Sequence, residues 1–341
     1  MPAGTRIGGY EVRNVLGTGT FGVVYRVIDE SGENEYAVKE YLPPDLAQRA
    51  PEGAAVVLRP KADPTHFEHG LKFFLNEGKL LQQVRHESMV EVVGGWQENG
   101  TGYMAMQLLS GRNLSDTLLA RWRTPSETSL RAMLETMLGP LEVLHQSKLQ
   151  HRDVAPESIL IEPDGRPVLM DLGSPRRVCA ARGETGPTGP RDGFAPIELY
   201  GEGKDLKRGP WTDLYSLGAT LYFLVARKPP PPAPERADDD RPALALHRPD
   251  GRHSLELLGL LDWMMAPKPA DRPRSVEAVR EALAGKGLPA RFAPTRGMRL
   301  RSLLRRYRKP LWILGILLAL AVMALAVRKG LPLLLPPPAD G

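Results

Sequence analysis

The fold of this chain is decided by a stretch near its middle, His151-Arg152-Asp153-Val154-Ala155-Pro156-Glu157-Ser158. Asp171-Leu172-Gly173 follows it, with Asp171 standing 18 residues after Asp153. Farther along the chain come Pro196-Ile197-Glu198, Asp213 in Trp-Thr-Asp-Leu-Tyr-Ser-Leu-Gly, and Arg272 in Asp-Arg-Pro. Such motifs are hard to obtain by chance in one fixed order, so we treat them as a single constellation.

Upstream of this constellation, Gly17-Thr18-Gly19-Thr20-Phe21-Gly22-Val23-Val24 fits the pattern G-x-G-x-x-G-x-V. Residues without side chains let backbone N–H groups approach phosphate oxygens. A dinucleotide-binding turn requires a helix directly after the glycines. Here one strand-like run, Tyr10 to Leu16, precedes the glycines and a second one, Val23 to Ile28, follows them. The pattern favours a hairpin lid over nucleotide phosphates, with Leu16 to Val24 as its binding segment. A plain glycine-rich turn is the alternative.

A third strand-like run, Glu35 to Tyr41, contains Ala37-Val38-Lys39. A lysine here would hold the α and β phosphates if a carboxylate fixed it, and Glu77 in the helical stretch Phe67 to Leu81 is the natural partner. A solvated strand lysine is the alternative, but the register with the glycine segment favours the binding role.

On these motifs the chain resembles the bacterial Hanks-type (eukaryotic-like) Ser/Thr protein kinases over about Tyr10 to Leu283. The resemblance implies an α+β, bilobal protein-kinase fold over 10–285. Its β-rich N-lobe, with one main helix, spans about 10–109, and its mostly helical C-lobe about 110–285. ATP is then the donor and protein hydroxyls are the acceptors.

The resemblance also implies roles for individual residues. Asp153 is the expected catalytic base, and Asp171 holds Mg²⁺ or Mn²⁺, with Ser158 at the second metal position; Lys39 and Glu77 complete the catalytic set. Met106 would be the gatekeeper of an adenine site that uses the backbone of Gln107 and Leu109 and the side chains of Val24, Ala37 and Leu160. For these last residues, ordinary core packing is the alternative.

The assigned roles suit phosphoryl transfer. Its transition state is loose and highly charged, so catalysis consists mostly of positioning and charge neutralisation. Asp153 needs only to orient a hydroxyl and accept its proton late.

The chain departs from the family pattern at three positions. Ser158 replaces an Asn, a change that weakens a metal ligand; Ala155 replaces the catalytic-loop Lys; and Arg191 replaces the Thr with which that Lys pairs. Because the last two changed together, we hypothesise that Arg191 supplies the missing cation. A solvated arginine is the alternative.

Two other functions would share part of this motif set. Ser158 leaves open a nucleotide-binding pseudokinase that acts as a membrane-tethered scaffold, although Lys39, Glu77, Asp153 and Asp171 are all present. A small-molecule phosphotransferase would lack the Pro196 to Glu198 element and Arg272. In the activation segment, Ser174, Thr185 and Thr188 are candidate phosphorylation sites, with Arg152 as a phosphate partner.

Composition bounds the remaining possibilities. With 341 residues, 42% hydrophobic and 25% charged, the chain suits folded domains and not wholesale disorder. Its one cysteine, Cys179, has no partner for an intramolecular disulfide. Residues 291–341 hold ten Lys/Arg and one acidic residue, which leaves the first 290 at 35 minus 39, or −4. A mildly acidic body argues against nucleic acid as a partner.

The basic C-terminal part predicts a membrane anchor. A basic juxtamembrane segment (286–309) precedes a transmembrane helix (310–327), of which Leu311 to Val327 is uncharged, and a short extracytoplasmic tail (328–341) follows. Seven of the 14 residues from Arg296 to Lys309 are Lys/Arg, so the positive-inside rule places the kinase domain in the cytoplasm and the C-terminus outside. This segment would also contact anionic lipid.

Elsewhere we expect a leader (1–9), strands at Met89 to Trp96 and Tyr103 to Leu109, a loop insertion up to Pro64, and a solvated loop from Lys228 to Pro249. Helices are expected at Leu118 to Trp122, Leu130 to Leu149, Trp211 to Val225, Leu255 to Met265 and Ser275 to Leu283.

Overall fold

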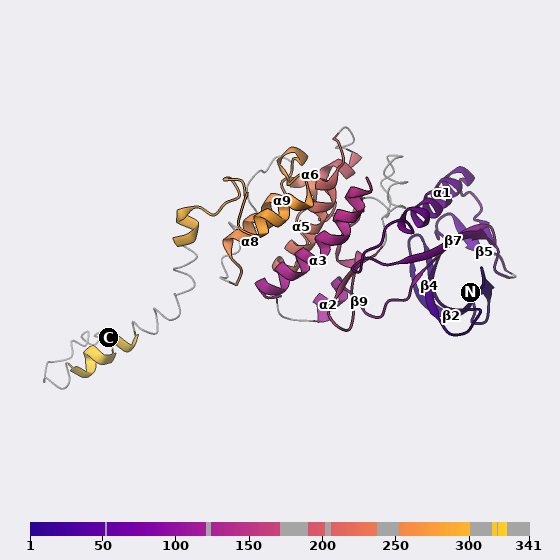
Figure 1. The fold of residues 1–341 in the computed structure, drawn as a ribbon, viewed down its shortest axis with the longest axis horizontal. Coiled ribbons are helices and arrows are strands. Elements are labelled where there is room, and N and C mark those ends of the chain that lie inside the picture. Colours follow the sequence, from indigo (N-terminus) through magenta and orange to yellow (C-terminus); the bar gives the residue numbers. More distant parts are fainter. Residues whose placement is uncertain are drawn as a thin grey trace, which may run out of the picture.

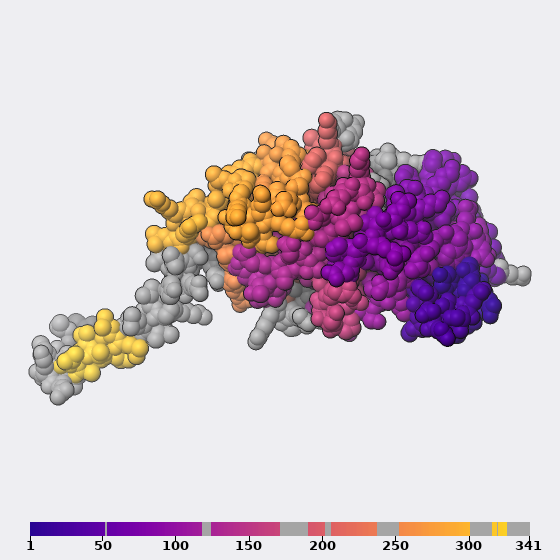
Figure 2. All heavy atoms as spheres, viewed as in Figure 1, coloured from indigo at the N-terminus to yellow at the C-terminus, as the bar shows by residue number. Residues whose placement is uncertain are grey.

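The computed structural model describes residues 1–51, 53–120, 124–170, 190–201, 206–236, 252–300, 316–318 and 320–325. These residues form two lobes, one built on an antiparallel sheet and one mostly helical (Figure 1). In space-filling view the two lobes make one continuous body (Figure 2). The predicted bilobal architecture is confirmed.

The N-lobe is a six-stranded sheet in the order β1-β2-β3-β4-β8-β7. The glycine segment joins β2 (Tyr10–Gly19) to β3 (Gly22–Asp29), and β4 is Glu35–Tyr41, as the sequence predicted. β7 (Val92–Glu98) and β8 (Thr101–Gln107) complete the sheet, so the first of these strands starts later than expected.

Two N-lobe segments hold structure that the sequence did not predict. The leader is partly structured, because β1 (Arg6–Ile7) pairs with β2 and Ile7 is 1% exposed. The loop insertion contains a hairpin of β5 (Ala47–Arg49) and β6 (Val56–Leu58). These strands are two or three residues long, too short to give a periodic signal.

One main helix, α1 (Pro64–Leu81), lies against β7 and β8. Asp63 caps it by accepting a hydrogen bond from the backbone N–H of Thr65, and the helix begins with proline, which lacks an N–H. Its buried residues face the sheet and continue into the larger core. On the opposite face of the sheet a smaller core gathers Ile7, Val12, Tyr25, Val27, Val38, Tyr103 and Ala105.

The C-lobe is built around α5 (Pro210–Ala226), which is buried along almost its whole length. Helices α3 (Glu127–Gln146) and α8 (Leu255–Met264) pack against it, and α9 (Val276–Leu283) packs on both of these. The predicted helices are confirmed with slightly shifted ends. Helix α2 (Leu114–Ala120) begins earlier than predicted, and residues 121–123 lie outside the described residues.

Small elements near the lobe junction flank the predicted base, Asp153. A three-stranded sheet of β9 (Arg112–Asn113), β10 (Ile159–Ile161) and β11 (Pro167–Leu169) lies beside the short helix η1 (Pro156–Ser158). Two further short helices are η2 (Ile197–Leu199) and η4 (Pro269–Asp271). The expected solvated loop contains α6 (Ala233–Arg236), and residues 237–251 are not described.

Within the described part of the chain, no helix combines the length and apolarity needed to cross a membrane. Half of the predicted span, residues 310–315, 319, 326 and 327, lies outside that part. Residues 316–318 and 320–325 are helical and stand apart from the lobes (Figure 1).

Candidate active site

The register of the N-lobe sheet aligns the predicted phosphate-binding residues. Gly17 on β2 pairs with Val24 on β3, Val24 pairs with Lys39 on β4, and Lys39 pairs with Met104 on β8. Directly paired residues project to the same face, and side chains alternate along each strand. Lys39, Val24 and Ala37 therefore share one face, whereas Val38 and Tyr25 project into the small core behind it.

The glycines of the hairpin differ in what requires them. A Cβ at Gly22, where φ is +151°, would lie 1.8 Å from the carbonyl oxygen of Glu40, so the protein's own backbone demands glycine. A Cβ at Gly17 or Gly19 would meet nothing within 4 Å. Internal packing therefore does not explain these two glycines, and the open space beside them suits the close approach of a phosphate group.

Helix α1 brings Glu77 to the same face of the sheet. Gly78 packs on Met104, since a Cβ at Gly78 would lie 3.3 Å from the Met104 Cε, and Met104 is the register partner of Lys39. Glu77 is 2% exposed. The fold thus buries the Glu77 carboxylate next to the contact between Gly78 of α1 and Met104, the residue that pairs with Lys39.

The predicted adenine residues occupy the edge between the lobes. Met106 pairs with Ala37, and Ala37 is 6% exposed. The N–H of Gln107 donates to the carbonyl of Glu91 (2.9 Å), so this N–H is engaged within the fold. Leu109 is half-buried just beyond β8, and Leu160 is half-buried on β10.

The buried side chain of Asp213 binds the backbone of the loop that carries Asp153, the predicted base. Asp213 lies in the first turn of α5, is fully buried, and accepts hydrogen bonds from the backbone N–H groups of His151 (2.9 Å) and Arg152 (2.7 Å). His145 Nε2 lies 2.8 Å from it. Burial raises the pKa of Asp213. The hydrogen bond from His145, the proximity of His145 and His151, and the backbone N–H of Arg152 lower it by more, so the net pKa lies below the usual range.

The loop backbone is bent to fit these anchors. Arg152 has a φ of +64°, a left-handed conformation that costs energy outside glycine. His151 is 1% exposed; its Nε2 lies 2.8 Å from the carbonyl of Met170, and its Nδ1 accepts the N–H of Asp153 at 3.3 Å. The imidazole thus ties Asp153 to the end of β11, and it carries its proton on Nε2.

Ser158 uses its hydroxyl within the loop. Its Oγ lies 2.9 Å from the carbonyl oxygens of both Asp153 and Ala155, and it accepts the N–H of Ala155 at 2.8 Å. The predicted metal position is therefore a loop-closing residue in the described structure.

Arg191 lies directly against the predicted base. Its Nε and one terminal nitrogen each lie 3.2 Å from a different oxygen of Asp153, and its other terminal nitrogen lies 2.7 Å from Glu157 Oε2. Burial lowers the pKa of Arg191, but the carboxylates of Asp153 and Glu157 outweigh it and raise the net value. The guanidinium is therefore charged at any physiological pH.

The Pro196 to Glu198 element is anchored in the core by Arg272. Glu198 and Arg272 form an ion pair of 2.7 Å, both side chains are 0% exposed, and Thr212 donates to the same carboxylate at 2.9 Å. Arg272 also donates to the carbonyls of Ala266 and Pro267 and lies 4.6 Å from the ring centroid of Tyr215. This pair fixes the end of the segment that carries Arg191.

Asp171 and the candidate phosphorylation sites Ser174, Thr185 and Thr188 lie outside the described residues. Among the described residues, no group of three or more His, Cys, Asp or Glu side chains is arranged to hold a metal ion.

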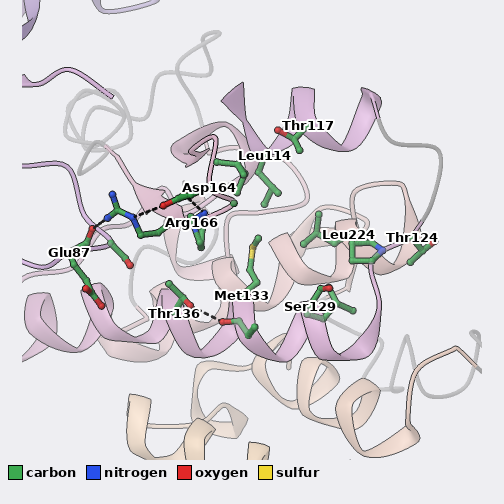
Figure 3. Close-up of a pocket in the computed structure, with 17 residues that line it drawn as sticks. Glu87, Leu114, Thr117, Thr124, Ser129, Met133, Thr136, Asp164, Arg166 and Leu224 are labelled. Atoms are coloured by element: carbon green, nitrogen blue, oxygen red, sulfur yellow. Dashed lines mark hydrogen bonds and ion pairs between the residues drawn. The ribbon is translucent and has the colours of Figure 1, made fainter. Parts of the chain in front are cut away.

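The structure also has a cavity of about 1100 Å³ on the C-lobe (Figure 3). Its lining comes from α2, α3 and the turn between β10 and β11, where Arg166 lies between Glu87 and Asp164. None of the predicted site residues lines it, so this cavity is separate from the proposed nucleotide site.

Sequence reasoning missed two residues of the site. His145, the penultimate residue of α3, contacts Asp213, and Glu157 contacts Arg191. His145 lies outside the quoted motifs, and Glu157 lies within the stretch from His151 to Ser158 but received no role there. Each meets its partner only through tertiary packing, across 68 and 34 positions respectively.

A curled sheet lobe, a helical lobe and a catalytic loop pinned by a buried aspartate define a protein-kinase fold. Residues 10–283 match the protein kinase domain family, and the chain belongs to that family.

Known relatives agree with this assignment. The chain is 26% identical over 271 residues to the probable serine/threonine-protein kinase MARK-C of Dictyostelium discoideum, covering 78% of this chain and 32% of the relative. It is 31% identical over 163 residues to the serine/threonine-protein kinase PknL of Mycobacterium tuberculosis, covering 48% and 40%. The chain thus spans well under half the length of these two relatives. Its domain is that of a serine/threonine protein kinase.

Solved structures share the fold. The PpkA-294 apo form superposes with a TM-score of 0.76 at 34% identity, covering 83% of this chain and 99% of that chain. The PknI kinase domain of Mycobacterium tuberculosis, at 24% identity and a TM-score of 0.63, covers 84% and 99% and shows the fold alone.

Proposed function

We propose that this chain transfers the γ-phosphate of ATP to serine or threonine hydroxyls of proteins. The observation that carries this proposal is the catalytic loop: Asp213 fixes the backbone of His151 and Arg152, and the loop presents Asp153 with its side chain 15% exposed. A carboxylate held this way can orient a hydroxyl and accept its proton.

The residues present fit ATP. Open space beside Gly17 and Gly19 leaves the hairpin backbone free to approach phosphates, and Lys39 lies on the same sheet face as Val24 and Ala37. Asp171, with Ser158, would hold the divalent cation, Mg²⁺ or Mn²⁺, and that cation would neutralise phosphate charge when bound.

Phosphorylation by the purified full chain tests this function. The chain is incubated in detergent with labelled ATP and Mg²⁺ or Mn²⁺, beside Asp153→Asn. We expect label on serine or threonine and a loss of about 10²–10⁴-fold in the variant, the range for removing a general base. Label that survives in Asp153→Asn, or that is found on tyrosine, would contradict the proposal.

A second candidate function is favoured by Ser158, whose hydroxyl is engaged with the loop backbone. A chain with a weakened metal site could bind nucleotide without transferring phosphate and act as a membrane-tethered scaffold. Nucleotide binding by a wild-type chain that incorporates no label with either metal ion would select this alternative.

We further propose that the kinase domain is anchored at the cytoplasmic face of a membrane by residues 310–327, with residues 286–309 on anionic lipid. The apolar side chains described in this stretch are exposed, with Leu318 at 66% and Val322 at 60%, and such a surface calls for an apolar environment. We expect the full chain to sediment with membranes and to require detergent for release, whereas a chain ending at residue 309 should remain soluble at high salt. An intact chain that is soluble without detergent would contradict the anchor.

A further inference from the structure

The side chain of Arg191 makes a two-point contact with the predicted base. Two nitrogens of its guanidinium meet the two oxygens of Asp153 at 3.2 Å each. The third nitrogen lies 2.7 Å from Glu157 Oε2, and this contact fixes the orientation of the guanidinium plane relative to Asp153. Side-chain exposure is 23% for Arg191 and 15% for Asp153, so the pair is largely withdrawn from water. A charged hydrogen-bonded pair is stronger in such a partly buried position than on the surface.

The backbone that carries Arg191 is held in a tight turn. Its carbonyl accepts the N–H groups of Phe194 (3.0 Å) and Ala195 (2.8 Å), both of which are buried. Gly193 has a φ of +82° and lies so close to the carbonyl of Pro230 that a Cβ would meet it at 2.7 Å. The turn leads directly into Glu198 and its buried partner Arg272. The turn therefore fixes the backbone from which the Arg191 side chain extends.

The catalytic loop itself offers no cation two residues beyond the base. Ala155 stands there, fully buried, with its N–H bound to Ser158. A transferring phosphoryl group adds negative charge beside a carboxylate that is already negative, so a cation at this point lowers the barrier.

We propose that Arg191 is a catalytic cation, which orients Asp153 and donates hydrogen bonds to the transferring phosphoryl group. The inference rests on the proposed kinase function. In that step the acceptor hydroxyl oxygen forms a bond to the γ-phosphorus while the bond to the β–γ bridging oxygen breaks. ADP keeps that electron pair and Asp153 takes the hydroxyl proton. Arg191 stays protonated throughout.

The test compares the full chain with Arg191→Ala, Arg191→Lys and a control, Arg280→Ala, whose ion pairs with Glu135 and Glu142 lie at the surface at 2.8 and 2.6 Å. We expect kcat to fall about 10²-fold or more in Arg191→Ala, the scale for losing one transition-state donor. The KM for ATP and the thermal midpoint should stay near wild type. Arg191→Lys should be intermediate, and added ethylguanidinium should restore Arg191→Ala in a saturable way.

Each outcome decides the matter. Wild-type kcat in Arg191→Ala overturns the inference alone. A loss of activity that follows loss of the folded state, or that ethylguanidinium does not restore, assigns Arg191 a structural role and also overturns it. If the wild-type chain and Arg280→Ala transfer no phosphate, the proposed function fails, and this inference fails with it.

Discussion

At the scale of single residues, Asp213 fixes the geometry of the loop before any substrate is present. Its two oxygens accept from consecutive backbone N–H groups and leave Arg152 in a left-handed conformation. Such a conformation persists only where the surroundings enforce it. The buried carboxylate supplies that enforcement, and the first turn of α5 favours its negative charge.

The lowered pKa of Asp213 predicts an acid dependence of stability. A carboxyl whose folded pKa lies below its unfolded value contributes stability above the unfolded pKa, about 4, and that contribution is lost as the pH falls through the folded pKa. Urea unfolding from pH 7 down to pH 3 should show this loss, and Asp213→Asn should show a shallower one. If the free energy of unfolding fell equally steeply with decreasing pH in both proteins, Asp213 would not be the source of the acid dependence.

The buried pair of Glu198 and Arg272 predicts a large effect of removing one partner. Arg272→Met strands the Glu198 charge and the two backbone carbonyls of Ala266 and Pro267, so the free energy of unfolding should fall by about 3–5 kcal/mol. Arg280→Met is the matched control, because Arg280 pairs with Glu135 and Glu142 at the surface, and it should cost less than about 1 kcal/mol. Equal losses in denaturant titrations would argue against the core role.

At the scale of elements, the glycine hairpin predicts a split between stability and binding. Gly22→Ala should destabilise the fold by about 1–3 kcal/mol, because its φ and its contact with the Glu40 carbonyl exclude a side chain. Gly19→Ala meets no neighbour, so its thermal midpoint should change little, while nucleotide affinity should fall about tenfold, or 1.4 kcal/mol.

Thermal unfolding and titration with a fluorescent ATP analogue separate these two effects. A Gly19→Ala chain that binds the analogue as tightly as wild type would show that the open space is not a phosphate site.

Elements were predictable where their pattern was long. β4 and α1 carry clear periodicities, and their observed bounds agree with the expected stretches. The hairpin of β5 and β6 could not be predicted, because three-residue strands have no period and depend on a tertiary contact: Arg49 reaches the buried Glu40. That contact places a charged pair behind the strand that bears Lys39.

At the scale of the whole molecule, the charge asymmetry between an acidic body and a basic C-terminal part predicts the orientation of the chain in a membrane. Replacing the seven Lys/Arg residues between Arg296 and Lys309 by Gln removes the positive bias that keeps this side in the cytoplasm. Protease digestion of sealed inverted vesicles should then leave a fraction of the kinase domain protected, whereas the wild-type domain should be fully cleaved. Equal cleavage of both proteins would contradict the rule's application here.

The sequence by itself determined the lobe order and predicted the catalytic set, because phosphate chemistry requires particular residue types at short, fixed spacings, as in the glycine segment and the stretch from His151 to Ser158. It also raised Arg191 as a hypothesis, since two departures from one pattern coincided. Only the tertiary structure decided that the guanidinium meets both oxygens of Asp153 and that Glu157 holds its third nitrogen. These partners are 34 and 38 residues apart, and folding alone brings such distant positions within hydrogen-bond distance.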